Sequence, residues 1–436
     1  MTAVVLAMLA IVGMAVAVLG TGSLIPALAS LAAVAVLAAA AVRVDLALLV
    51  LVATAPLENA LQVSGNPLLT LTKVAGFLTF FGFAVNAVAT RRRIEISWTH
   101  AVVVALLLLA MVSTVQARDE TLALVTTFRY ASFVALYFVI SQMARDHRLL
   151  RRVVWALSLV AALAGVLALR AYLSGEAFAA VTPGGDPNDD AFSWITILPL
   201  TLWLFTTTSR KARVLLVIMV ATTITASLYS LSRGALVGLA AGIAWEVLVE
   251  RRHVRLFVGA AVAALVASII VLNVNPQQLR ISLLGKQKVA AHNVEARLDA
   301  WGAAADLAVR EPILGIGPGN FGLYYGEETG KPPGTSGLGV VHNAYLDLAA
   351  ELGVGGLLLF LAYLFGSFRQ LSEARRRQAG PPGLAAAART SLVMATVAAI
   401  TLSEQYFQPF WLLGGIGAAL WTEVKAREST PVYTST

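Results

Sequence analysis

Two residues in one stretch of the chain carry side chains suited to phosphate binding and to proton transfer. Arg297 and His342 both lie between the apolar runs that end near Leu272 and begin near Leu346. A guanidinium matches phosphate oxygens with two parallel hydrogen bonds. A neutral imidazole can act as a general base at pH 7. The two residues therefore predict phosphate binding and base catalysis; the alternatives are a structural salt bridge for Arg297 and a structural role for His342.

Three more cations lie near the ends of apolar runs. Arg233 sits between two such runs, and a charge at a membrane boundary is costly and tends to be functional. The alternative is that its side chain reaches out to the interface as an ordinary helix-end arginine. Lys73 and Arg129 lie just inside the ends of their own runs. They either line the same cavity as Arg233 or extend to the interface.

Other polar groups point to no metal or cofactor. The turn Asp186–Asp190 lacks the ligand spacing of an EF-hand and is better suited to capping the helix that follows. The glycine-rich Gly315–Gly319 has neither the lysine nor the preceding strand of a phosphate-binding loop. The chain has no Cys, so it has no thiolate metal site. We therefore predict neither a metal nor a cofactor.

The composition is that of a membrane protein. Of the 436 residues, 58% are hydrophobic and only 13% are charged, against about 25% charged residues in soluble domains. The formal net charge of +8 has a simple cause, because Lys and Arg accumulate in cytoplasmic loops. We therefore expect membrane lipids, and no nucleic acid, around the protein.

The apolar runs predict an all-α, multi-pass protein with about 12 to 14 membrane-spanning helices. The candidate spans lie near Val4–Leu19, Leu24–Val42, Val44–Pro56, Leu71–Thr90, Trp98–Gln116, Leu122–Met143, Val153–Tyr172, Ala191–Thr208, Val214–Tyr229, Ala235–Val249, Val254–Leu272, Leu346–Phe368, Leu384–Leu402 and Phe410–Trp421. Basic clusters fall at every second loop, which by the positive-inside rule places those loops and both termini in the cytoplasm.

One outward segment, of roughly seventy residues, is far longer than the other connections. It predicts three regions: an N-terminal membrane bundle (1–272), an outer loop (273–343), and C-terminal membrane helices (344–436). Within the loop, Val294–Arg310 reads as an amphipathic helix that ends before Pro312. On its wheel the acidic residues share one face, and Arg297 borders the apolar face of Val294, Leu298, Trp301 and Ala305.

The rest of the loop predicts turns, a lid and a second helix. Gly315–Asn320 reads as a series of turns, and Lys331–Gly339 as a flexible lid. His342 opens the next helix with Asn343 as its N-cap, and the positive helix end keeps the imidazole neutral. Arg280, Lys286 and Lys288 form a basic patch for an anionic phosphate group or for lipid headgroups.

Four short motifs in this order resemble the O-antigen ligase/polymerase superfamily. The resemblance covers roughly Pro183 to Trp421, and Glu351-Leu352-Gly353 also fits it. The motifs are Ser-Leu-Ser-Arg-Gly-Ala (Ser230–Ala235), Ala-Arg-Leu-Asp-Ala-Trp (Ala296–Trp301), Pro-Ile-Leu-Gly-Ile-Gly-Pro-Gly-Asn-Phe (Pro312–Phe321) and His-Asn-Ala-Tyr-Leu (His342–Leu346).

The resemblance implies a function, a location and a site. It implies a GT-C-like, inverting glycosyltransferase of the bacterial inner membrane that uses no metal and faces the periplasm. The donor would be a glycan on undecaprenyl pyrophosphate. The family's essential Arg, Arg and His map to Arg233, Arg297 and His342, with His342 as the general base. Both arginines would bind the pyrophosphate, and Lys73 and Arg129 are carried over loosely as further pyrophosphate ligands.

Three functions compete. The favoured one is the ligase that joins O-antigen to lipid A-core and completes lipopolysaccharide. The second, in the same family, is an O-antigen polymerase or a protein O-oligosaccharyltransferase. The third is a transporter or flippase, which should show broken helices and charges near the midplane. This sequence instead places its unusual charges at the outer boundary.

Overall fold

The computed structural model describes residues 43–55, 62–63, 66–143, 145–329, 339–403, 405 and 407–429. The predicted spans Val4–Leu19 and Leu24–Val42 lie outside these residues, as does nearly all of the predicted lid, Lys331–Gly339. The backbone of residues 278–293 is described but their side chains are not, so the predicted basic patch of Arg280, Lys286 and Lys288 also lies outside the described part.

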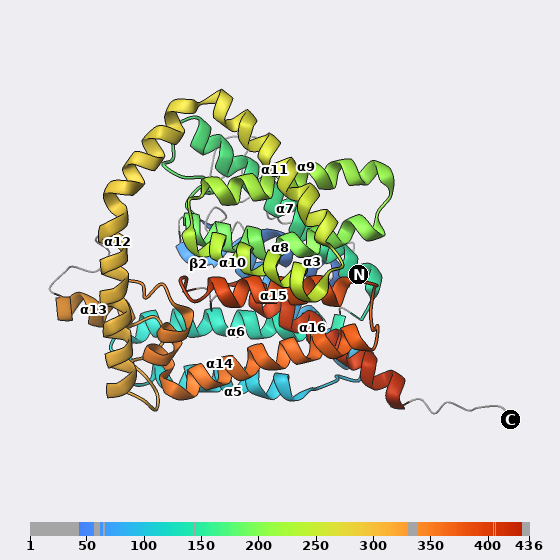
Figure 1. The fold of residues 1–436 in the computed structure, drawn as a ribbon. Helices are drawn as coiled ribbons and strands as arrows, with labels where there is room; N and C mark the ends of the chain where they lie inside the picture. Colours follow the sequence, from blue (N-terminus) through green and yellow to red (C-terminus); the bar gives the residue numbers. More distant parts are fainter. Residues whose placement is uncertain are drawn as a thin grey trace, which may run out of the picture. The chain divides into compact units, whose positions relative to one another are not determined.

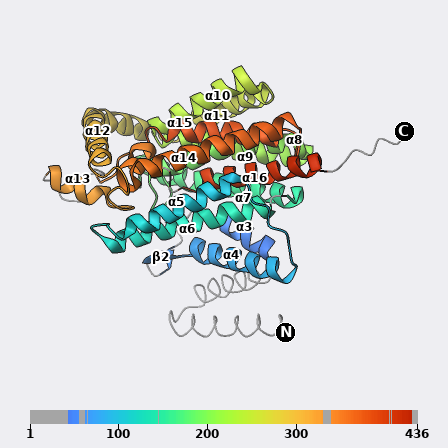
Figure 2. The same cartoon turned by 90° about the horizontal axis from the view of Figure 1, so that it is seen from below.

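The described chain divides into two compact units, residues 1–94 and 95–436. The first unit contains helix α3 (Val44–Thr54), an antiparallel pair of short strands, β1 (Gln62–Val63) and β2 (Asn66–Thr70), and helix α4 (Leu71–Ala89). Figure 2 shows α3 and α4 of this unit in blue. Apart from this small hairpin, the described chain is helical.

The second unit is a bundle of helices with two further helices, α12 and α13, in the predicted outer loop. Its elements are α5 (Trp98–Thr114), α6 (Glu120–Met143), α7 (His147–Leu173), α8 (Pro187–Thr207), α9 (Arg210–Tyr229), α10 (Arg233–Trp245) continuing into the π-helix η2 (Glu246–Glu250), α11 (Val254–Val274), α12 (Pro276–Arg310), α13 (Phe321–Thr329), α14 (Ala344–Arg376), α15 (Leu384–Ala398) and α16 (Gln408–Ser429).

The helices confirm a multi-pass membrane protein. Each predicted span from Val44–Pro56 onward falls on a helix of the structure. In the described residues, 6 helices are long and apolar enough to cross a membrane: α4, α6, α7, α9, α11 and α14. Large apolar side chains point outward on these helices, such as Val258, Val262 and Leu265 on α11. The total of about 12 to 14 spans stays a prediction.

Helix α10 packs against α15 without room for side chains. Cβ atoms built at Gly234, Gly238 and Gly242 of α10 would lie 2.4 Å from Thr401 Oγ1, 2.8 Å from Ala398 Cβ and 2.1 Å from Met394 Cε. Small residues every fourth position let two membrane helices approach this closely. The far end of α10 is fixed by an ion pair, because buried Glu250 lies 2.7 Å from Arg389 of α15.

The long outer segment is built around one continuous helix. We predicted a helix at Val294–Arg310, but α12 already begins at Pro276, directly after α11, and runs for 35 residues. Its end at Arg310, before Glu311-Pro312, is as predicted. Figure 1 shows α12 in ochre, crossing the end of the second unit's helices where α14 begins.

The buried face of α12 differs from the predicted one. Ala300, Ala304 and Leu307 are buried, whereas Val294 and Leu298 are 48% and 59% exposed. Arg297 lies three residues before Ala300 and so shares its face. The prediction that Arg297 turns toward the protein body is therefore confirmed, but the face it shares is lined by alanines. The acidic residues Glu295, Asp299 and Asp306 are exposed, as predicted.

The glycine-rich segment after α12 docks onto a kink in α14. Gly353 has φ +68° and ψ −177°, which interrupts α14, and Val354 N–H donates to the Pro312 carbonyl at 2.9 Å. Ile316 and Gly317 donate to the carbonyls of Ala350 and Glu351, both at 3.0 Å. The predicted turns are confirmed. Their role is to join the loop to α14 through backbone hydrogen bonds.

We expect Gly353→Ala to destabilise the protein. The backbone angles at this position are open essentially only to glycine, and the new Cβ would lie 2.6 Å from the Pro312 carbonyl oxygen. The loss should be about 1–3 kcal/mol, seen as a lower Tm in detergent. Gly355→Ala is the matched control, because its Cβ would meet only Leu109 Cδ2 at 3.6 Å. Equal Tm values for the two variants would contradict this account of the kink.

Candidate functional site

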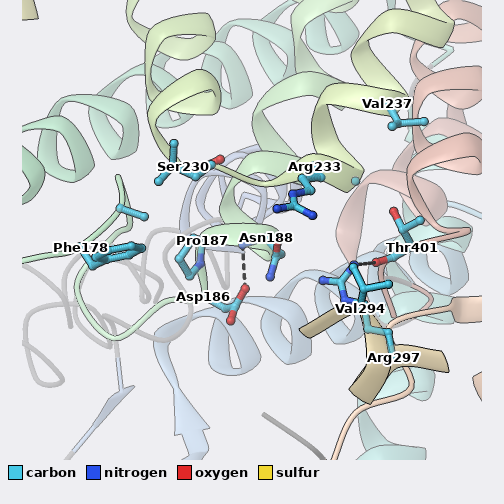
Figure 3. Close-up of a pocket in the computed structure, with 13 residues that line it drawn as sticks. Phe178, Asp186, Pro187, Asn188, Ser230, Arg233, Val237, Val294, Arg297 and Thr401 are labelled. Atoms are coloured by element: carbon cyan, nitrogen blue, oxygen red, sulfur yellow. Dashed lines mark hydrogen bonds between the residues drawn. The ribbon is translucent and has the colours of Figure 1, made fainter. Parts of the chain in front are cut away.

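A pocket of about 420 Å³ lies where the beginnings of α8 and α10 meet α12 and the segment after α15. Figure 3 shows Arg233, Arg297, Asp186 and Asn188 around it. The full lining is Phe178, Ala179, Asp186, Pro187, Asn188, Ser230, Leu231, Arg233, Gly234, Val237, Val294, Arg297 and Thr401. The structure thus brings two of the predicted site residues, Arg233 and Arg297, to one cavity.

Arg297 enters the pocket from α12. Its side chain is half-buried, and Nη1 donates to the Thr401 carbonyl at 3.3 Å. Burial lowers the pKa of its guanidinium, the charge of Arg233 lowers it further, and Asp186 acts in the opposite direction. Two guanidinium groups that repel each other in a half-buried cavity attract a polyvalent anion.

Arg233 enters from the first turn of α10. The helix is capped by Ser232, whose Oγ accepts from Ala235 N–H at 3.4 Å, and the residue before it, Leu231, has a positive φ of 59°. A helix N-terminus carries partial positive charge, which disfavours a cation and favours an anion. The positive charge of the arginine and the partial positive charge of the helix end therefore act together, and both favour a phosphate group in the pocket.

Asp186 and Asn188 line the pocket from the start of α8. Asp186 is the N-cap of α8 and accepts from Asn188 N–H at 2.7 Å, which confirms the predicted capping role of this turn. The loop before α8 is held in place by Asp190, whose carboxylate accepts a hydrogen bond from Thr182 N–H at 2.7 Å. Among the described residues that line the pocket, Asp186 is the one carboxylate.

His342 lies beside this pocket without lining it. The residue before it, Val341, accepts a hydrogen bond from Trp301 Nε1 of α12 at 3.0 Å. Two residues after it, Ala344 N–H donates to the carbonyls of Ala399 (2.9 Å) and Leu402 (3.0 Å), which flank Thr401. These bonds place His342 between α12 and the segment that holds the Arg297 side chain.

The imidazole of His342 is neutral, but for a different main reason than we predicted. Burial lowers its pKa to about 4, the charge of Arg297 adds to this, and Asp186 opposes it. Helix α14 begins at Ala344 with Asn343 as N-cap, as predicted, so His342 precedes the helix and does not open it. Its φ of 54° is in the left-handed region.

Lys73 and Arg129 are not among the residues that line the pocket. Arg129 is exposed on α6, and Lys73 lies on α4 in the other compact unit. Their assignment as pyrophosphate ligands stays a prediction. Among the described residues, no group of three or more His, Asp or Glu side chains is placed to hold a metal ion.

Sequence reasoning missed three contributors to the site. Asn188 and Thr401 line the pocket, and Trp301 holds the backbone before His342. The sequence predicts a helix cap at Asp186–Asn188, but a cap pattern does not indicate which other helix end lies close to it in the fold. Trp301 stood in a recognised motif and was assigned to an apolar face, so its indole N–H was the overlooked signal.

Residues 218–361 match the family model described as O-antigen ligase. The matched range runs from α9 into α14 and contains Arg233, Arg297 and His342. It confirms the family resemblance that the motifs indicate. Among curated proteins, none matches the chain.

We expect the imidazole of His342 to titrate near pH 4, well below the ordinary value of 6.5. Nuclear magnetic resonance of protein labelled at histidine would measure this, with His342→Ala to assign the signal. Arg297→Gln should raise the midpoint, because it removes a positive charge that disfavours imidazolium. Arg310→Gln, the same change at the exposed end of α12, should leave it unchanged. A midpoint near 6.5 in the wild type would contradict the burial of His342.

Proposed function

We propose that this chain, a member of the O-antigen ligase/polymerase superfamily through its residues 218–361, is a glycosyltransferase that moves a glycan from undecaprenyl pyrophosphate to lipid A-core. The observation that carries the proposal is the convergence of Arg233 and Arg297 on one pocket, with His342 beside it. The family match supports lipid-linked glycan chemistry in general. The donor, acceptor and mechanism are our proposal.

The two arginines bind the pyrophosphate of the donor. A pyrophosphate in the pocket satisfies two guanidinium groups that otherwise repel each other, and it also meets the N-terminus of α10. The same groups stabilise the negative charge that develops on the leaving phosphate oxygen. Because the two cations already supply this charge, we expect the reaction to proceed without a metal ion.

His342 acts as the general base. It takes the proton of an acceptor hydroxyl, whose oxygen forms a bond to the anomeric carbon. The bond from that carbon to the phosphate oxygen breaks, and undecaprenyl pyrophosphate leaves with the electron pair. Attack from the face opposite the leaving group inverts the anomeric centre. Bound pyrophosphate opposes the field of Arg297, so the imidazole becomes more basic once the donor is in place.

The site faces the periplasm of the bacterial inner membrane in this proposal. The pocket lies at the start of α8, the start of α10 and the end of α15. The basic cluster Arg210–Arg213 begins α9, and the basic cluster Arg251–Arg255 follows η2, so both clusters lie near the other ends of α8 and α10. Basic loops stay in the cytoplasm. A lipid-linked glycan therefore reaches the pocket from the outer leaflet.

We expect His342→Ala to abolish transfer while donor binding remains. Loss of a general base costs about 10²- to 10⁴-fold in rate, and the arginines that bind the donor are untouched. The assay uses purified protein, undecaprenyl-pyrophosphate-linked glycan and an acceptor, with EDTA present. His147→Ala is the matched control and should transfer at the wild-type rate, because His147 is exposed at the start of α7 and does not line the pocket. Transfer by His342→Ala at the wild-type rate would contradict the proposal that His342 is the general base.

The acceptor is varied in the same assay. Product on lipid A-core supports the ligase, longer lipid-linked glycan supports a polymerase, and product on an acceptor protein supports an O-oligosaccharyltransferase. If none of the three acceptors is modified and the glycan instead crosses the bilayer of a vesicle, the protein is a flippase and the proposal is wrong. If transfer required added metal, only the prediction that the reaction needs no metal ion would be wrong.

We expect Arg297→Lys to lower transfer by about 10- to 100-fold. Lysine keeps the charge but cannot make the paired hydrogen bonds of a guanidinium, and a bond to a charged group contributes about 1.5–3 kcal/mol. The loss should appear in kcat/KM for the donor. Arg310→Lys is the control, because Arg310 is exposed at the end of the same helix. Full activity of Arg297→Lys would argue against contact with pyrophosphate.

A further inference from the structure

We propose that a cavity between α8, α9 and α11 binds one anionic phospholipid, whose headgroup phosphate contacts Arg255 while part of an acyl chain fills the cavity. The inference is independent of the proposed function, because this cavity shares no lining residue with the pocket of the two arginines. It lies near the other end of α8, where Leu202 and Phe205 line it shortly before the helix ends at Thr207. We call it the Arg255 cavity.

The Arg255 cavity has a volume of about 140 Å³ and an apolar wall. Helix α9 packs against both α8 and α11, and Figure 1 shows α9 and α11 side by side. Leu202 of α8 and Val220 of α9 are 1% and 2% exposed and form the floor of the cavity, whereas Val217 is 45% exposed at its rim. Hydrocarbon fills such a space better than water does. The cavity is large enough for part of an acyl chain only.

Helix α11 provides a track of small residues that begins at a cation. Arg255 lies in its first turn, and Gly259 and Ala263 follow at intervals of four residues, so the three share one face. The track is about 12 Å long at 1.5 Å per residue. A Cβ at Gly259 would meet no atom within 4 Å, so the cavity is open there. A charged end followed by an open apolar track fits the phosphate and upper acyl chain of a phospholipid.

Arg255 is the one charged residue that lines this cavity in the described part of the chain. It is exposed, and none of the described carboxylates pairs with it. The carboxylates that precede it in the sequence, Glu250 and Glu246, are buried and bonded elsewhere. Glu250 lies 2.7 Å from Arg389, and Glu246 accepts a hydrogen bond from Thr390 Oγ1 at 3.0 Å. The Arg255 guanidinium is therefore available to an anion from outside the chain, and it can bind phosphate oxygens in pairs.

The side of the cavity where α9 and α11 begin is strongly positive. Arg210–Arg213 opens α9 and Arg251–Arg255 leads into α11, and neither segment contains Asp or Glu. Basic residues between and beside membrane helices attract anionic lipid headgroups. A zwitterionic headgroup would add a further cation to this region, whereas an anionic headgroup adds none. The charge distribution therefore favours an anionic phospholipid.

The first experiment is thermal unfolding of the purified full chain in non-ionic detergent with added phosphatidylglycerol. We expect Tm to rise by about 2–4 °C and to keep rising with lipid concentration, because a ligand of the folded state stabilises it by mass action. Phosphatidylcholine with the same acyl chains should give no such rise. An equal rise with phosphatidylcholine, or with glycerol 3-phosphate alone, would overturn the proposal.

Gly259→Leu tests whether the acyl chain occupies the cavity. The variant should not lower Tm in detergent alone, because its Cβ enters open space and leucine favours a helix more than glycine does. Its response to phosphatidylglycerol should be lost. Gly302→Leu is the matched control, since a Cβ there also meets no atom within 4 Å but lies on α12, away from this lining. A full response to the lipid in Gly259→Leu would contradict the assigned site.

Arg255→Gln tests the headgroup contact and leaves the cavity open. Native mass spectrometry should show that Kd for phosphatidylglycerol rises about 10- to 100-fold, because hydrogen bonds to a charged group are lost. Arg93→Gln makes the same change in another exposed basic cluster and should leave Kd unchanged. If both variants weaken binding equally, the lipid responds to net charge alone and the assigned site is wrong. None of these measurements uses glycan transfer, so failure of the proposed function would appear only in the transfer assay.

Discussion

The direct backbone contact between the turns after α12 and the kink of α14 is the constraint on which the rest of the site depends. Gly315 and Gly353 both have positive φ, and a Cβ at either would lie within 2.6 Å of the facing backbone. Hydrogen bonds from Ile316, Gly317 and Val354 close this joint. It fixes the end of α12, and a continuous helix transmits that position to Arg297, about 20 Å away at 1.5 Å per residue.

A second close contact brings the other arginine to the same place. Helix α10 lies against α15 through three glycines, and Gly234 directly follows Arg233. The segment at the end of α15 provides the Thr401 carbonyl that Arg297 contacts. One arginine is therefore placed by a helix that crosses the end of the bundle, and the other by a helix inside it. The site forms only where the two meet.

The sequence was sufficient for the helices and for the local signals at their ends. The cap at Asn343, the stop before Pro312 and the turns around Gly315–Asn320 all follow from short-range chemistry. The buried face of α12 did not, because the large apolar residues Val294 and Leu298 are exposed to a large extent while Ala300 and Ala304 are buried. Small residues let α12 approach its neighbours closely, so the size of an apolar side chain did not mark the packed face of this helix. No sequence signal indicated that Asp186 and Arg297 line the same pocket, because this depends on how separate helix ends assemble.

The left-handed backbone of His342 affects the entropy part of the activation barrier of the proposed reaction. A residue with a side chain adopts φ 54° at a cost, and here the Asn343 cap, the Trp301 indole and the two bonds of Ala344 hold it there. The backbone that carries the imidazole therefore keeps its position when substrates arrive. The entropy of ordering that backbone is lost once, when the chain folds, and does not add to the activation barrier of each turnover.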